Sequence, residues 1–93
     1  MSPSIVVNHD ASRHCFEAFV DELRCELDYV LDGPVMRIVH TGVPGPLEGR
    51  GIAAELVRAA LTWARAHRYK VDPVCSYVAV YLRRHTEWTD LLR

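Results

Sequence analysis

The sequence has few cysteines, no long apolar run and almost no net charge. Its three cysteines have no regular spacing, which argues against a disulfide framework and against a paired Cys-x-x-Cys zinc site. No uncharged stretch approaches the roughly 18 residues that span a bilayer, and no basic region precedes an apolar stretch near the amino terminus. We therefore expect a cytoplasmic protein with reduced thiols, no metal site and no membrane partner.

The balance of charge bears on the kind of ligand. Eleven basic against twelve acidic residues leave a formal charge of −1, which is not the electrostatic footprint of a nucleic-acid-binding protein. Residues 47–93 nevertheless hold eight basic and five acidic residues. This local excess suits a small polyphosphate ligand, although scatter of this size also arises by chance. The length and composition fit one globular domain over residues 1–93.

The first half of the chain has the period of strands. Between Leu23 and Leu31 apolar residues alternate with charged ones, which predicts a strand with one face on a core. Strands are also predicted at Ile5–Asn8, Cys15–Val20 and Val35–Val43. The reversal at residues 32–34 contains Gly and Pro and makes the last strand antiparallel to residues 23–31.

The second half changes to a helical period. Apolar residues three or four apart predict a helix from Ile52 to about His67. Lys70–Val74 then returns as a strand beside the third, which makes a right-handed strand-helix-strand crossover. Val78–Leu82 fits either a strand or one short helix. The fold class is α+β, with an antiparallel meander that leads into the crossover.

Residues 40–54 carry the most informative motif: a strand, a Pro and Gly turn, a Gly-Arg-Gly loop and a helix. A helix start exposes unpaired N–H groups and a positive dipole end, and glycines remove the side chains that would keep a pyrophosphate away. The segment is a candidate anion cradle. A flexible connection between a strand and a helix also explains the pattern.

The same segment resembles the acyl-CoA signature of the GCN5-related N-acetyltransferases (GNAT), through His40-Thr41-x-Val43-Pro44 and Glu48-Gly49-Arg50-Gly51-Ile52-Ala53. Glu48 stands where that family usually has Gln or Arg. Four further segments resemble the short single-domain branch of the superfamily: Phe16-Glu17-Ala18, Leu27-x-Tyr29, Pro73-x-Cys75-Ser76-Tyr77-Val78 and Tyr81-x-Arg83-Arg84-His85-x-Glu87-Trp88. The likeness runs from about Arg13 and favours a helix at Val78–Leu82, which makes the fold GNAT-like with a short C-terminal helix.

The resemblance implies acetyl-CoA as the small-molecule acyl donor. The backbone around Thr41 and Val43 would bond the pantetheine arm like an added strand. The pyrophosphate would lie on Glu48, Gly49, Arg50, Gly51, Ile52 and Ala53. Arg50 would supply the positive charge that Glu48 lacks, and Tyr77 and Arg84 are further candidates for cofactor binding. The alternative for the basic cluster Arg83-Arg84-His85 is an acidic substrate or a solvated surface.

Three residues are candidates for catalysis. Cys75 precedes the second helix, where a thiolate is stabilised and its pKa lowered, so it is a candidate nucleophile; the alternative is a small buried apolar residue. Cys15 and Cys25 lie in strand patterns and are expected to pack. His40 is a candidate proton acceptor or a structural residue. In larger acetyltransferases a Tyr protonates the leaving thiolate, so Tyr81, or Tyr77 one turn earlier, is a candidate acid unless it packs in the core.

The sequence thus predicts an acetyl-CoA-dependent N-acetyltransferase of an unknown amine acceptor, either a small molecule or a protein. Transfer would pass through an acetyl group on Cys75 or by direct attack of the amine on the thioester. The alternatives are a non-catalytic CoA-binding module and a protein-interaction domain without a cofactor. At this length the acceptor site is expected to be shallow or shared with another molecule.

Overall fold

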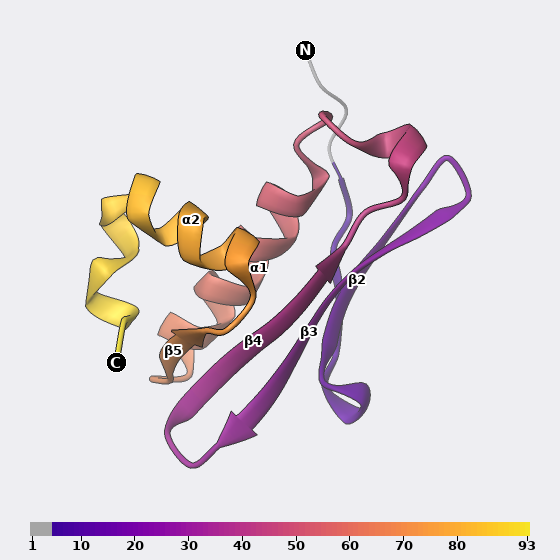
Figure 1. Cartoon of the computed structure of the whole chain (residues 1–93). Helices are drawn as coiled ribbons and strands as arrows, with labels where there is room; N and C mark the ends of the chain where they lie inside the picture. The colour runs from indigo at the N-terminus through magenta and orange to yellow at the C-terminus, as the bar shows by residue number, and fades with distance from the viewer. Residues whose placement is uncertain (1–4) are drawn as a thin grey trace.

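The computed structural model describes residues 5–93 and contains one five-stranded sheet in the order β1-β2-β3-β4-β5. The first three pairings are antiparallel and the pairing of β4 with β5 is parallel (Figure 1). The strands are β1 (Asn8–Asp10), β2 (Cys15–Val20), β3 (Leu23–Asp32), β4 (Val35–Gly42) and β5 (Lys70–Pro73). The predicted α+β class, with its meander and crossover, is confirmed.

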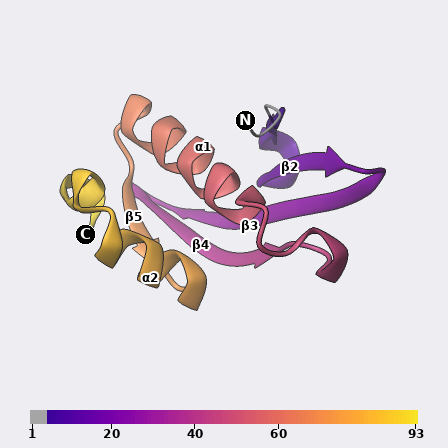
Figure 2. The ribbon, with the colours of Figure 1, turned by 90° about the horizontal axis from the view of Figure 1, so that it is seen from above.

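Residues 5–93 also contain two α-helices and three short 3-10 helices: α1 (Ile52–Ala66), α2 (Ser76–Arg84), η1 (Ala11–Arg13), η2 (Gly45–Leu47) and η3 (Thr86–Leu91). Helix α1 connects β4 to β5 and lies across the sheet, packed on β2 to β5 (Figure 2). Helices α2 and η3 pack beside the β5 end of this core. The ambiguous segment at residues 78–82 is helical, as the resemblance implied. No helix in the described part is both long and apolar enough to cross a membrane.

The alternation along β3 separates two faces of the sheet. Cys25, Leu27 and Tyr29 are buried under α1, whereas Arg24, Glu26 and Asp28 lie on the opposite, outer face. There the Arg24 guanidinium bonds to the carboxylates of Glu17, at 2.7 Å, and of Glu26, at 2.6 Å. The helix side of the core is closed by buried residues of α1: Ile52, Leu56, Val57, Ala60, Leu61 and Ala64.

One predicted strand is wrong. The first strand is Asn8–Asp10 rather than Ile5–Asn8, because the apolar residues Ile5 and Val7 pack against the edge of the core without pairing in the sheet. Two other strands end one residue early, β4 at Gly42 and β5 at Pro73. After Pro73 the chain turns, and the Val74 N–H bonds to the Asp72 carbonyl at 3.0 Å.

Helix η3 was not predicted from the sequence. Trp88 and Leu91 of this segment are buried in the common core, and the Arg65 guanidinium lies 4.4 Å from the centre of the Trp88 ring. The 3-10 segment therefore docks on α1 through tertiary contacts that no local periodicity reveals.

Candidate functional site

The site begins where β4 and β5 separate. Their pairing ends at Ile38 and Pro73, and the Cys75 N–H then donates to the Ile38 carbonyl at 2.9 Å as the chain turns into α2. On the other side of β4, Asp28 pairs with His40 and Tyr29 with Ile38, so one residue of β4 is extra and forms a bulge. The last residues of β4 therefore continue without a partner from β5.

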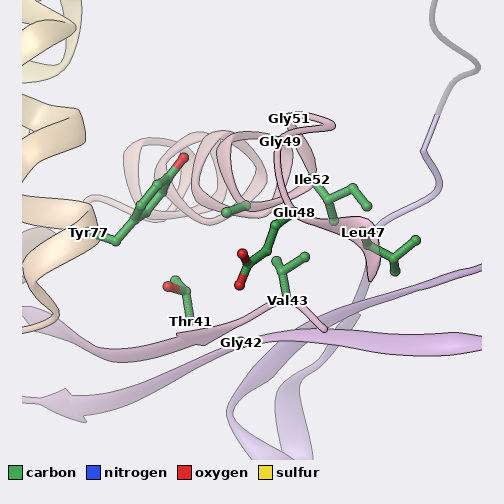
Figure 3. Close-up of a pocket in the computed structure, with 10 residues that line it drawn as sticks. Thr41, Gly42, Val43, Leu47, Glu48, Gly49, Gly51, Ile52 and Tyr77 are labelled. Carbon is green, nitrogen blue, oxygen red and sulfur yellow. The ribbon is translucent and has the colours of Figure 1, made fainter. Parts of the chain in front are cut away.

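A cavity of about 580 Å³ lies between this end of β4, the loop that follows it, the first turn of α1 and the start of α2 (Figure 3). Ten residues line it: Thr41, Gly42, Val43, Leu47, Glu48, Gly49, Gly51, Ile52, Ala53 and Tyr77. The cavity brings together the strand, the glycine loop and the second helix, which are separate in sequence.

The glycine loop is built for a close approach to the backbone. Gly49 and Gly51 both have φ of +81°, a left-handed conformation that favours glycine, and a Cβ on either would enter open space. Gly51 caps α1 without a side-chain bond, and the first helical bond runs from Glu55 N–H to the Gly51 carbonyl. The preceding amides, at residues 52–54, have no acceptor within the helix. This end of α1 fits an anionic group such as a pyrophosphate.

Eight of the ten residues predicted to bind the donor line the cavity: Thr41, Val43, Glu48, Gly49, Gly51, Ile52, Ala53 and Tyr77. The other two do not line it. The Arg50 guanidinium pairs with the Asp21 carboxylate at 2.8 Å, in the turn between β2 and β3. Arg84 is exposed at the C-terminal end of α2, whereas Tyr77 at its beginning faces the cavity. Two lining residues, Gly42 and Leu47, were not predicted from the sequence. Neither has a side chain typical of a binding site, and both line the cavity only because the loop after β4 passes along it.

Cys75 is half-buried and does not line the cavity, but it lies beside the lining residue Thr41. Its sulfur is 3.7 Å from the hydroxyl oxygen of Thr41. Burial acts to raise the pKa of this thiol, but the Val78 amide, the Thr41 hydroxyl and the Tyr77 amide together outweigh burial and leave the pKa below its ordinary value. Burial raises the pKa of both Cys15 and Cys25. Cys75 is therefore the thiol most readily ionised.

The two tyrosines of α2 have different surroundings. Tyr77 is 41% exposed and lines the cavity, and burial raises the pKa of its hydroxyl. Tyr81 is buried, and its ring stacks on His85 at 4.0 Å between centres. The hydroxyl available to a ligand in the cavity is thus that of Tyr77, one turn before the residue that the sequence favoured as an acid.

His40 lies on the outer face of the sheet, away from the Thr41 side chain that faces the cavity. Its Nε2 is 4.0 Å from the Glu26 carboxylate, and His40, Glu26 and Asp28 each place a potential ligand atom within 4.8 Å of the others. Neither carboxylate was singled out from the sequence, because their closeness to His40 depends on strand register. The catalytic role of His40 stays a prediction.

The site lies in an α+β fold whose sheet parts at a bulge beside a glycine-rich helix start. Residues 15–91 match the model of the GCN5-related N-acetyltransferase family. The chain is 32% identical over 87 residues to protein NATD1 of Xenopus tropicalis, covering 90% of this chain and 80% of that protein. It is also 32% identical over 84 residues to NATD1 of Gallus gallus, covering 87% and 76%.

The fold has a solved counterpart. The solution structure of a GCN5-like protein from Staphylococcus aureus superposes with a TM-score of 0.77 and 25% identity, over 95% of this chain and 87% of that one. The chain therefore belongs to the GCN5-related N-acetyltransferase family, which confirms the resemblance seen in its sequence. Family and fold together make it a small acyltransferase.

Proposed function

We propose that the protein is an acetyl-CoA-dependent N-acetyltransferase that acts on an amine acceptor. The observation that carries this proposal is the cavity itself. Its lining includes the helix-start residues 51–53 and Tyr77, Cys75 lies beside the lining residue Thr41, and the end of β4 here pairs with β3 but not with β5. Those are the features that a long thioester donor with a pyrophosphate requires.

The backbone would do most of the binding. Amides at the start of α1 would hold the pyrophosphate, where the dipole of a 15-residue helix adds to their positive character. The edge of β4 that no longer pairs with β5, at Thr41 and Val43, would receive the amide-bearing pantetheine arm in the manner of an added strand. Because these interactions use main-chain groups, they do not depend on a basic residue at position 48.

Two routes of transfer fit these residues. In the direct route, the acceptor nitrogen attacks the thioester carbonyl, the carbon–sulfur bond breaks, and the leaving thiolate takes a proton. The Tyr77 hydroxyl, which lines the cavity, supports this protonation. The nitrogen loses its extra proton to a base or to water.

In the two-step route, the Cys75 thiolate attacks the thioester carbonyl and the thiolate of CoA leaves. The acceptor nitrogen then attacks the acetyl carbonyl carbon of the Cys75 thioester, the carbon–sulfur bond breaks, and Cys75 is released as a thiolate while the nitrogen loses its extra proton to a base or to water. The lowered pKa of Cys75 and its position beside Thr41 support this route. We also propose a cytoplasmic location, which the three free cysteines support.

The test is a transfer assay that follows release of the CoA thiol from acetyl-CoA with a panel of amines, namely polyamines, amino acids and lysine peptides. Release with at least one amine, together with an acetylated product by mass spectrometry, is the expected result. Binding of acetyl-CoA without transfer to any amine would instead indicate a non-catalytic CoA-binding module.

A further inference from the structure

Glu48 has an unusual place for a carboxylate in a site that receives a polyanion. Figure 3 shows its side chain pointing into the cavity, toward the side formed by Thr41 and Val43. Among the residues that line the cavity, Glu48 is the one with a formal charge at neutral pH. The cavity therefore has one carboxylate beside the positive end of the α1 dipole before any ligand binds.

Within residues 5–93, no basic side chain pairs with this carboxylate. The nearest arginine in sequence, Arg50, forms its ion pair with Asp21 instead, at 2.8 Å. The next acid along the chain, Glu55, does have a partner, the Arg58 guanidinium at 2.7 Å. Among the described residues, Glu48 thus has no basic partner, and it lies on the loop that leads to the amides at residues 52–54, which have no acceptor within the helix.

We propose that the Glu48 carboxylate acts as a charge gate, a group in the donor site that weakens the binding of the polyanionic acyl donor by electrostatic repulsion. This inference rests on the proposed function and adds to it. Two like charges about 6 Å apart at an effective dielectric constant of about 40 repel enough to change an affinity about tenfold. The cradle amides must overcome this repulsion, so the gate sets a weak affinity for CoA and favours its release.

The experiment measures the dissociation constant of CoA by calorimetry for the wild type, Glu48→Gln and Glu48→Ala. At an ionic strength of about 0.01 M, both variants are expected to bind CoA about tenfold more tightly than the wild type. At about 0.15 M the gain should shrink to about threefold, because the Debye length falls from about 30 Å to about 8 Å. Glu55→Gln removes the same charge from the first turn of α1 outside this cavity and should stay within about twofold of the wild type.

Three results would overturn the gate while leaving the donor site intact. Glu48→Gln that binds CoA no more tightly than the wild type, or more weakly, would show that the charge does not repel the donor. A gain in Glu48→Ala alone would show that the side chain acts by its bulk. Equal gains in Glu48→Gln and Glu55→Gln would show a general effect of net charge. If neither the wild type nor the variants bind CoA, the proposed function itself is wrong.

Discussion

The Cys75 sulfur lies 3.7 Å from the Thr41 hydroxyl oxygen, although the two residues are 34 positions apart in the chain. The parting of β4 from β5 brings them together, because β4 continues past its last pair while β5 turns into α2. The hydroxyl is one of the groups that lower the pKa of this thiol. The end of β4 and the start of α2 together thereby lower the pKa of Cys75, whereas burial raises the pKa of Cys15 and Cys25.

Thr41→Val should slow the reaction of Cys75 with iodoacetamide at neutral pH by about tenfold or more, since a hydrogen bond to a charged group contributes about 1.5–3 kcal/mol and a tenfold change corresponds to about 1.4 kcal/mol. The rate is measured against pH by peptide mapping, and the profile should move to higher pH. Thr62→Val is the control, because the Thr62 hydroxyl bonds to the Arg58 carbonyl on the exposed side of α1. An unchanged pH profile in Thr41→Val would show that this hydroxyl does not lower the pKa of Cys75.

The two-step route predicts an acetyl group on Cys75, and little on Cys15 or Cys25, after incubation with acetyl-CoA. Cys75→Ala should then abolish transfer and keep CoA binding, because the pyrophosphate cradle lies on another segment. Cys15→Ala serves as the control, since that side chain is 2% exposed and remote from the thioester in this scheme. Wild-type turnover by Cys75→Ala would establish direct attack by the amine.

Tyr77→Phe should lower the rate of transfer by about 100-fold if its hydroxyl protonates the leaving thiolate, the lower end of the usual range for general acid catalysis. The dissociation constant of CoA should change by less than about threefold. Tyr81→Phe is the matched variant one turn later, buried beside His85, and should leave the rate nearly unchanged. The reverse order of effects would return the role of acid to Tyr81.

The sequence predicted those parts of the fold whose signal is local. The alternation along Leu23–Leu31, the turn at Gly33 and the helical period from Ile52 are each read from neighbours in the chain, and the structure has all three elements. The glycine loop could be predicted for the same reason, since its residues are also neighbours in the chain. The predicted strand at Ile5–Asn8 was wrong because apolar residues that pack on the edge of a core have the same sequence pattern as a short strand.

Contacts between residues far apart in the chain could not be predicted from the sequence. Tyr77 and Tyr81 share one helix face, so their spacing alone did not show which hydroxyl meets the cavity. The position of His40 on the outer face depends on a bulge in β4, which shifts the pairing by one residue. The inward direction of Glu48 depends on the path of the loop, and no spacing rule fixes it.

Stability should fall as the pH drops below about 6.5, because of His9. Its Nε2 is 2.6 Å from the Tyr29 hydroxyl and its ring stacks on Phe16 at 4.1 Å, and burial lowers the pKa of His9. A histidine with a depressed pKa binds fewer protons in the folded state than in the unfolded state, so acid favours unfolding. Urea unfolding at pH 7.5 and pH 5.5 measures this, and His9→Phe should reduce the difference. An equal pH dependence in both proteins would contradict the assignment.

The central claim, that the cavity at the start of α1 receives the pyrophosphate of acetyl-CoA, is tested most directly by the thermal shift that CoA causes in two glycine variants. Gly51→Glu puts bulk and negative charge at the cradle. Gly33→Glu places the same side chain at another left-handed glycine, with φ of +56°, in the distant turn between β3 and β4. Both variants bear comparable backbone strain.

For the wild type, CoA at a hundredfold excess over its dissociation constant should stabilise the fold by about 2.7 kcal/mol and raise the melting temperature accordingly. A folded Gly33→Glu is expected to keep this shift, and a folded Gly51→Glu is expected to lose it. Equal shifts in the two variants, or no shift in the wild type at millimolar CoA, would contradict the central claim.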